Sequence, residues 1–168
     1  MLQIVEAISQ EQLSQVNELL HEYMMWDHHT TSSLGLDADK LIETHYNSGV
    51  FDLPGEYAFP DGRLLLALYE TRVAGCGAVR KIEDGICEIK RMYVRPEFRG
   101  KQIGRQLLER LLEEARQIGY THARLETVTF MKEALAMYDA FGFRIIEPYF
   151  ELSDELKPIT QFMELKLA

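Results

Sequence analysis

The chain has 168 residues, of which 46% are hydrophobic, and a formal net charge of −9. This length and composition suit one globular domain, residues 1–168, and the acidic balance argues against nucleic acid as the main partner. No apolar run reaches the roughly 20 residues that span a bilayer, and the N-terminal sequence lacks the basic start of a signal peptide, so we expect a cytoplasmic protein without a membrane partner.

The first third of the chain predicts a strand followed by helices. Apolar and polar residues alternate over Leu2–Ala7, which predicts a strand. Ser9 is a suitable helix N-cap, and apolar residues at helical spacing carry that helix to about Met25. The stretch 26–62 has no clear period except for a helix predicted over Asp37–Tyr46. Its turn-rich segments are Pro54-Gly55 and Pro60-Asp61-Gly62.

Three strands in succession predict an antiparallel meander in the middle of the chain. Residues 70–72 are short enough to join the first two as a hairpin, and Glu83-Asp84-Gly85 is a strong turn signal before the third. Arg95-Pro96 ends the third strand, because proline cannot donate to a sheet ladder. The predicted strands are Leu64–Tyr69, Val73–Ile82 and Ile86–Val94.

The last part of the chain predicts a helix–strand–helix succession and two final strands. A broad apolar stripe predicts a helix from about Gln102 to Ile118, and Gly119 closes it. The order gives an α/β (α+β) fold in which a mixed sheet combines the meander with a β-α-β crossover. The remaining predicted elements are a strand at His122–Val128, a helix at Met131–Phe141, and strands at Phe143–Ile146 and Gln161–Leu167.

The cysteines and the histidine pair do not point to a metal. Cys76 and Cys87 fall in predicted strands and are expected to be buried, reduced thiols. His28-His29 is an adjacent pair without a third ligand at a suitable spacing. We therefore predict no metal site.

A basic cluster lies at the junction between the third meander strand and the following helix. A helix N-terminus presents unpaired amides and a positive dipole end, and small residues before it let a phosphate approach. Gly100 and Gly104 are those small residues here. The sequence therefore predicts a pyrophosphate cradle, although a solvated basic helix face is the alternative. The cluster consists of Lys90, Arg91, Arg95, Arg99, Lys101, Arg105 and Arg110, opposed by Glu97 and Glu109.

The junction resembles the GCN5-related N-acetyltransferase (GNAT) family. That family carries Arg/Gln-x-x-Gly-x-Gly/Ala here, and the segment Glu88–Gly104 offers Arg99-x-x-Gln102-x-Gly104, with Gln102 in place of the middle glycine. The segment Ala134–Phe143 is similar to the second conserved helix of the family, with a tyrosine before a terminal Gly-Phe. Met131 stands where the family often has asparagine.

The resemblance implies a fold, a cosubstrate and a set of site residues. The fold is a mostly antiparallel central sheet of about seven strands flanked by helices, with a splayed parallel strand pair that binds acetyl-CoA. Met92 and Val94 match the strand positions beside the pantetheine arm, and Tyr138 matches the residue near the thioester sulfur. The pyrophosphate loop corresponds to Arg99, Gly100, Lys101, Gln102, Ile103, Gly104 and Arg105.

The implied reaction is direct attack of an amine on the thioester, which needs a proton acceptor and benefits from a donor to the leaving thiolate. Tyr138 is the predicted acid, and its alternative is a core aromatic on a helix face. Glu88 is the predicted base, because it matches the glutamate of histone-type members and is expected to share a strand face with Lys90, Met92 and Val94. A salt-bridged Glu88, with a water chain as base, is the alternative.

The acceptor amine is not identified by the sequence. The net charge favours a cationic acceptor, and both small-molecule and peptide or protein amines remain open. A non-catalytic acetyl-CoA sensor or subunit is the alternative function, because Gln102 and Met131 depart from the motifs. Residues considered for the acceptor pocket are Tyr23, Trp26, His28, His29, Tyr57, Phe59 and Tyr149. A homodimer is considered through Phe162, Met163 and Leu165 of the last strand.

Overall fold

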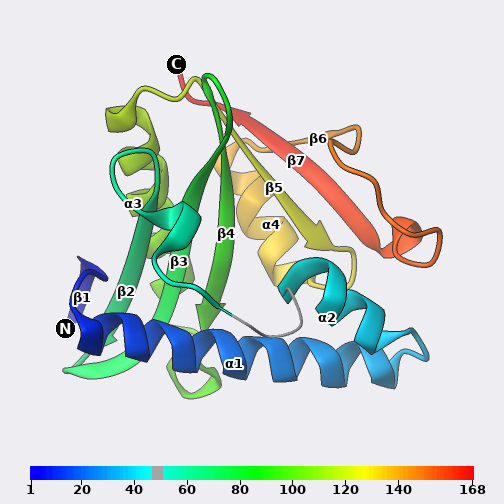
Figure 1. Cartoon of the computed structure of the whole chain (residues 1–168), viewed down its shortest axis with the longest axis horizontal. Helices are drawn as coiled ribbons and strands as arrows, with labels where there is room; N and C mark the ends of the chain where they lie inside the picture. The colour runs from blue at the N-terminus through cyan, green and yellow to red at the C-terminus, as the bar shows by residue number, and fades with distance from the viewer. Residues whose placement is uncertain (47–50) are drawn as a thin grey trace.

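The computed structural model describes residues 1–46 and 51–168, and it has the predicted mixed fold (Figure 1). One seven-stranded sheet has the order β1-β2-β3-β4-β5-β7-β6, in which β4 and β5 form the parallel pair. The strands are β1 (Leu2–Glu6), β2 (Arg63–Tyr69), β3 (Arg72–Glu83), β4 (Ile86–Val94), β5 (His122–Val128), β6 (Arg144–Ile146) and β7 (Thr160–Lys166). The helices are α1 (Gln10–Ser33), α2 (Ala38–Tyr46), α3 (Ile103–Ile118) and α4 (Lys132–Phe141), with short 3-10 turns at Gly55–Tyr57, Pro96–Phe98 and Lys157–Ile159.

Helices cover both faces of the sheet. Side chains of α3 and α4 pack with one face in a cluster that includes Leu107, Leu111 and Phe143. On the other face, α1 contributes Leu19 and Leu20 to a second cluster with β2 and β3. Each buried aliphatic side chain stabilises the fold by about 1.5–3 kcal/mol relative to exposure, so the two layers hold the central strands between them.

Helix α1 is longer than predicted, since it ends at Ser33 rather than near Met25. Its start is as predicted: Ser9 and Gln12 form a capping box. Beyond Met25 the inward positions are taken by polar residues, Asp27 and Thr31, both of them buried. The apolar period therefore stops while the helix continues, and this is why the sequence pattern missed two turns that carry part of the site.

The parallel strands β4 and β5 separate after a short paired segment. Their register joins Ile86 to His122, Cys87 to Ala123 and Glu88 to Arg124, and then ends. Both strands continue beyond this point, β4 to Val94 and β5 to Val128. The predicted splayed pair is thus confirmed, and it opens the middle of the sheet.

A β-bulge in β4 reverses which face its side chains occupy. Ala78 pairs with Lys90 and Cys76 pairs with Tyr93, so Arg91 and Met92 together oppose one residue of β3. Arg91 has a φ of 59°, outside the extended region. The predicted shared face of Glu88, Lys90, Met92 and Val94 is therefore wrong. Met92 and Val94 pack toward the α3 layer, whereas Tyr93 packs into the α1 layer.

The last strand in sequence is not at the sheet edge. Strand β7 lies between β5 and β6 and pairs with both. Phe162 and Met163 are each 3% exposed and belong to cores of their own chain. Because these two side chains are buried, they cannot contact a second copy of the chain. The homodimer stays a prediction, but Phe162 and Met163 would not form its interface. Among the described helices, none has the length and apolar character needed to cross a bilayer.

Candidate active site

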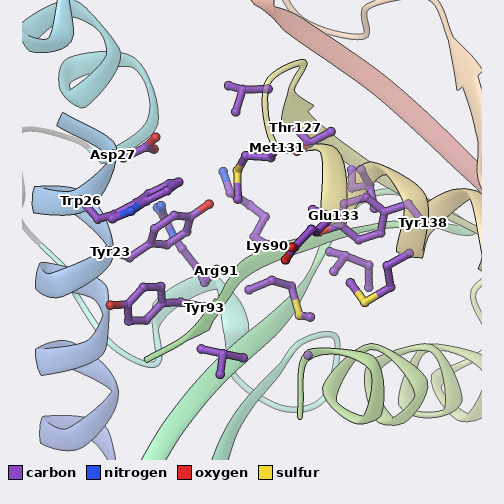
Figure 2. Close-up of a pocket in the computed structure, with 18 of the residues that line it drawn as sticks. Tyr23, Trp26, Asp27, Lys90, Arg91, Tyr93, Thr127, Met131, Glu133 and Tyr138 are labelled. Atoms are coloured by element: carbon purple, nitrogen blue, oxygen red, sulfur yellow. The ribbon is translucent and has the colours of Figure 1, made fainter. Parts of the chain in front are cut away.

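A cavity of about 860 Å³ occupies the opening between β4 and β5 (Figure 2). Its wall combines residues from α1, α2, β4 and β5 with the start of α3 and much of α4. Figure 2 shows Tyr23, Trp26 and Asp27 of α1 on one side, Tyr138 of α4 on the other, and Lys90 between them. One end of the cavity therefore lies at the predicted phosphate loop, and the other lies under α1 and α2.

The start of α3 has the unpaired amides and open backbone that the predicted anion cradle requires. No backbone amide from Gly100 to Arg105 donates a hydrogen bond within residues 1–46 and 51–168, and the first backbone bond of the helix runs from Gln106 N–H to Gln102 carbonyl at 3.1 Å. Unpaired amides at a helix N-terminus bind phosphate oxygens. Gly100 has a φ of 81° with open space where a side chain would lie, so the backbone there can be approached closely.

Gln102 keeps the backbone conformation that glycine would adopt freely. Its φ of 65° and ψ of 17° place it in the left-handed region at the N-cap of α3. A residue with a Cβ occupies this region at a cost of about 1 kcal/mol or more. The replacement of the family glycine thus preserves the course of the loop and its exposed amides.

Most of the predicted cofactor residues lie on the cavity wall. Arg99 donates from Nε to the Val94 carbonyl at 3.1 Å, which holds the loop against the end of β4. Lys101 is not on the wall, and its ammonium lies 5.1 Å from the centre of the Tyr69 ring. Its contact with the cofactor stays a prediction. The predicted residues on the wall are Met92, Val94, Arg99, Gly100, Gln102, Ile103, Gly104, Arg105 and Tyr138.

Tyr138 lies on the inner face of α4 and is buried. Its ring packs edge to face against Phe143, with 5.8 Å between the ring centres. Burial raises the pKa of Tyr138 to about 12, because the tyrosinate would lose its hydration. The hydroxyl therefore keeps its proton throughout the physiological range, as a general acid must.

Glu88 is held by three side chains of its own protein. Its Oε1 accepts from Arg80 Nε at 2.8 Å, its Oε2 accepts from the Tyr149 hydroxyl at 2.6 Å, and Lys90 Nζ lies 3.8 Å away. The side chain is 1% exposed and is not part of the cavity wall. The base role of Glu88 stays a prediction, but these contacts are those of the salt-bridged alternative.

The residues considered for the acceptor pocket divide into two groups. Tyr23 and Trp26 lie on the cavity wall. His28 pairs instead with Asp39 outside the cavity, at 3.1 Å, and His29 is exposed. The other three also lie off the wall: Tyr57 accepts from Arg91, Phe59 is 74% exposed, and Tyr149 donates to Glu88.

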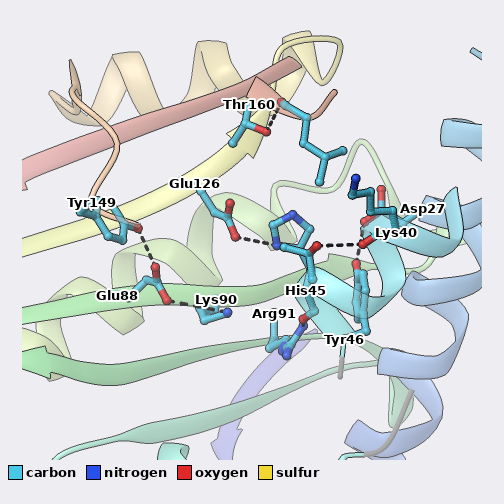
Figure 3. A network of polar contacts seen from close by, with 12 residues as sticks. Asp27, Lys40, His45, Tyr46, Glu88, Lys90, Arg91, Glu126, Tyr149 and Thr160 are labelled. Carbon is cyan, nitrogen blue, oxygen red and sulfur yellow. Dashed lines mark hydrogen bonds and ion pairs between the residues drawn. The ribbon is translucent and has the colours of Figure 1, made fainter. Parts of the chain in front are cut away.

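Polar wall residues that the sequence did not single out surround Tyr23 and Trp26. Asp27 is 8% exposed and accepts a hydrogen bond from the Tyr46 hydroxyl at 2.7 Å. Burial raises the pKa of Asp27. His45 Nδ1 lies 2.9 Å from Glu126 Oε1 (Figure 3). These residues come from α1, α2 and β5, and no local motif connects them, so only the fold could bring them together.

Lys90 lies on the cavity wall between Tyr23 and Tyr138, and its side chain is 18% exposed (Figure 2). Burial lowers its pKa, and the neighbouring Glu88 carboxylate opposes that shift only in part because it lies 3.8 Å away and is already bound to Arg80. Among the described residues, no three His, Cys, Asp or Glu side chains are grouped to hold a metal ion.

Comparison with known proteins agrees with the cradle and the splayed strands. The profile of the Acetyltransferase (GNAT) family matches residues 17–143. An IAA acetyltransferase of Azospirillum brasilense is 41% identical over 111 residues, which cover 66% of this chain and 71% of the relative. The uncharacterized N-acetyltransferase YjgM of Escherichia coli K12 is 34% identical over 120 residues, covering 70% and 71%.

Solved structures share the fold over nearly the whole chain. A GNAT acetyltransferase from Staphylococcus aureus superposes with a TM-score of 0.72 at 18% identity and covers 100% of both chains. The PaiA N-acetyltransferase of Thermoplasma acidophilum, solved with coenzyme A, gives a TM-score of 0.65 at 19% identity and covers 99% of both. The cavity, the unpaired amides and these matches lead to one conclusion: the chain belongs to the GNAT family and is an acetyl-CoA-dependent N-acetyltransferase.

Proposed function

We propose that the enzyme acetylates a small amine that carries a second cationic group, and that this group is held by Asp27. The observation behind the proposal is a buried carboxylate on the acceptor side of the cavity. Within residues 1–46 and 51–168, no cationic side chain forms an ion pair with Asp27, and its hydrogen-bond donor is the Tyr46 hydroxyl. A buried carboxylate without a cationic partner is costly unless a ligand supplies the charge.

Aromatic rings beside Asp27 support the same class of acceptor. The Tyr23 and Trp26 rings lie 6.3 Å apart on one face of α1, and both line the cavity. Aromatic faces attract ammonium groups with about 0.5–2 kcal/mol per contact, depending on desolvation. Because α1 and α2 border this end of the cavity, we propose a small molecule rather than a protein as acceptor.

In the proposed reaction the amine nitrogen forms a bond to the thioester carbonyl carbon and gives up a proton to a basic side chain of the cavity. The carbon–sulfur bond breaks, and the thiolate leaves with a proton from Tyr138. The loop Arg99–Arg105 binds the pyrophosphate, and Met92 and Val94 flank the pantetheine arm. Protein side chains alone carry the proton transfers, with no metal. We also propose a cytoplasmic location, where the buried thiols Cys76 and Cys87 stay reduced.

The test is thiol release from acetyl-CoA with a panel of diamines, polyamines, basic amino acids, neutral amines and basic peptides. We expect turnover to be fastest with small amines that bear a second ammonium. Asp27→Asn should lower kcat/KM for those acceptors by roughly 10-fold or more, the loss of a buried charge-assisted contact. It should leave neutral amines nearly unchanged.

Asp39→Asn is the matched control, since Asp39 is an exposed aspartate of α2 that pairs with His28 away from the cavity. It should behave as the native enzyme with every acceptor. Preference for neutral amines, or an equal effect of Asp27→Asn on all amines, would rule out the cationic class. Absence of turnover with the whole panel would favour a non-catalytic acetyl-CoA sensor.

A further inference from the structure

His45 and Glu126 form an imidazole–carboxylate pair inside the cavity. His45 is near the C-terminal end of α2, and Glu126 is on β5, beyond the residues that pair with β4. His45 Nδ1 lies 2.9 Å from Glu126 Oε1, and the two side chains are 17% and 15% exposed. Both residues belong to the cavity wall. The pair is therefore shielded from bulk water but open to a bound acceptor.

The pair has a defined orientation. An ionised Glu126 accepts the proton of Nδ1–H, which leaves the lone pair on Nε2 of the imidazole. The end of α2 is fixed because Arg91 Nη1 donates to the His45 carbonyl at 3.0 Å. The other charged groups that face the pair are Asp27 of α1 and Lys90 and Arg91 of β4. Figure 3 shows Glu126 and His45 joined across the space between β5 and α2.

Two other groups near the reaction space are less suited to accept a proton. Glu88 is bound by Arg80 and Tyr149 and is not on the cavity wall. Lys90 lines the cavity, but within residues 1–46 and 51–168 its ammonium makes no hydrogen bond that would fix its direction, and its ion-pair contact is with Glu88 at 3.8 Å. Of the three groups compared, the imidazole pair combines access to the cavity with a fixed orientation, and imidazole is the side chain most often used as a general base.

We propose that His45 is the general base of the transfer and that Glu126 is its positioning residue. As the amine nitrogen bonds to the carbonyl carbon, its proton passes to Nε2 of His45, and Glu126 stabilises the resulting imidazolium. The thiolate takes a separate proton from Tyr138, so charge and protons balance. This inference rests on the proposed acetylation of a small amine, and it replaces Glu88 in the base role.

The experiment measures kcat/KM against pH with the best acceptor from the panel, for the native enzyme and for His45→Gln, Glu126→Gln and Glu88→Gln. We expect His45→Gln to lower kcat/KM by roughly 10²-fold or more. Glu126→Gln should lower kcat while leaving KM near the native value, because the imidazole loses the carboxylate that orients it and stabilises its positive charge. Added imidazole should restore part of the activity of His45→Ala.

His28→Gln is the matched control, because His28 also pairs with a carboxylate between α1 and α2, but outside the cavity. Thermal stabilisation by acetyl-CoA should persist in every variant, which separates loss of the base from loss of the fold. If His45→Gln keeps native kcat/KM, or if Glu88→Gln alone abolishes activity, the inference is overturned while the proposed function stands. If the native enzyme acetylates no amine, both are overturned.

Discussion

At the scale of single residues, the proposed acid role of Tyr138 depends on the pKa that its burial imposes. Since burial raises this pKa to about 12, the proton is present at every pH at which the enzyme would be assayed. We expect Tyr138→Phe to lower kcat by roughly 10²-fold, the usual contribution of a positioned acid. The loss should be the same from pH 6 to pH 10, and a pH–rate profile measures it.

A tyrosine outside the cavity provides the control for this prediction. Tyr120 is buried and donates to the Asp61 carbonyl at 2.6 Å, away from the cavity wall. Tyr120→Phe should cost stability but leave kcat unchanged. A Tyr138→Phe enzyme with native kcat would show that Tyr138 is the core aromatic of the alternative interpretation.

Gln102 carries the second prediction at this scale. Its left-handed conformation costs about 1 kcal/mol or more for a residue with a Cβ, whereas glycine adopts it freely. We expect Gln102→Gly to raise the free energy of unfolding by up to about 1 kcal/mol, partly offset by the greater freedom of glycine in the unfolded chain. Gln102→Ala keeps the Cβ and should gain nothing. Denaturant unfolding of both variants tests this prediction. Equal free energies of unfolding for Gln102→Gly and Gln102→Ala would contradict the strain argument.

At the scale of elements, the bulge in β4 directs Arg91 toward α2 and the turn at Gly55–Tyr57. Its Nε donates to the Tyr57 hydroxyl and its Nη1 to the His45 carbonyl, both at 3.0 Å, and its guanidinium lies over the Tyr46 ring at 5.2 Å. One side chain therefore connects three elements around the acceptor side of the cavity. The guanidinium fork makes contacts that an ammonium cannot reproduce together.

We expect Arg91→Lys to lower the free energy of unfolding by about 2–3 kcal/mol, because buried partners of a charged donor are left unpaired. Hydrogen exchange should rise in α2 more than in α3. Arg144→Lys is the control, since Arg144 is an exposed residue of β6 whose change should cost less than about 0.5 kcal/mol. Unchanged exchange in α2 would refute the connecting role of Arg91.

At the scale of the whole molecule, the cosubstrate should link the two halves of the sheet where β4 and β5 part. A ligand at 100 times its Kd stabilises the native state by about 2.7 kcal/mol. For a chain of this size we expect acetyl-CoA to raise Tm by about 5–10 °C. S-acetylpantetheine lacks the phosphates that the start of α3 would bind, and should shift Tm far less. Thermal melts with acetyl-CoA and with S-acetylpantetheine measure the two shifts. An unchanged Tm at millimolar acetyl-CoA would exclude the proposed cofactor cavity.

The sequence predicted local elements well where one physical signal was strong. Alternation and turns placed β4 and β5 at their observed bounds, and Gly119 and Gly142 ended α3 and α4 in the left-handed conformation. The prediction of α1 stopped early because Asp27 and Thr31 occupy its inward face. The face assignment of Glu88 was wrong because a bulge at Arg91 leaves no reliable mark in a sequence read with period two.

By itself, the sequence determined most helices and strands, the glycine-containing loop at the start of α3 and the place of Tyr138 on α4, because each depends on residues close together in the chain. The tertiary structure decided the acceptor side of the cavity. Asp27, His45 and Glu126 belong to three elements and meet only when α1 and α2 cover the opening between β4 and β5. Burial and long-range pairing give these side chains their chemistry, and neither is encoded in a local pattern.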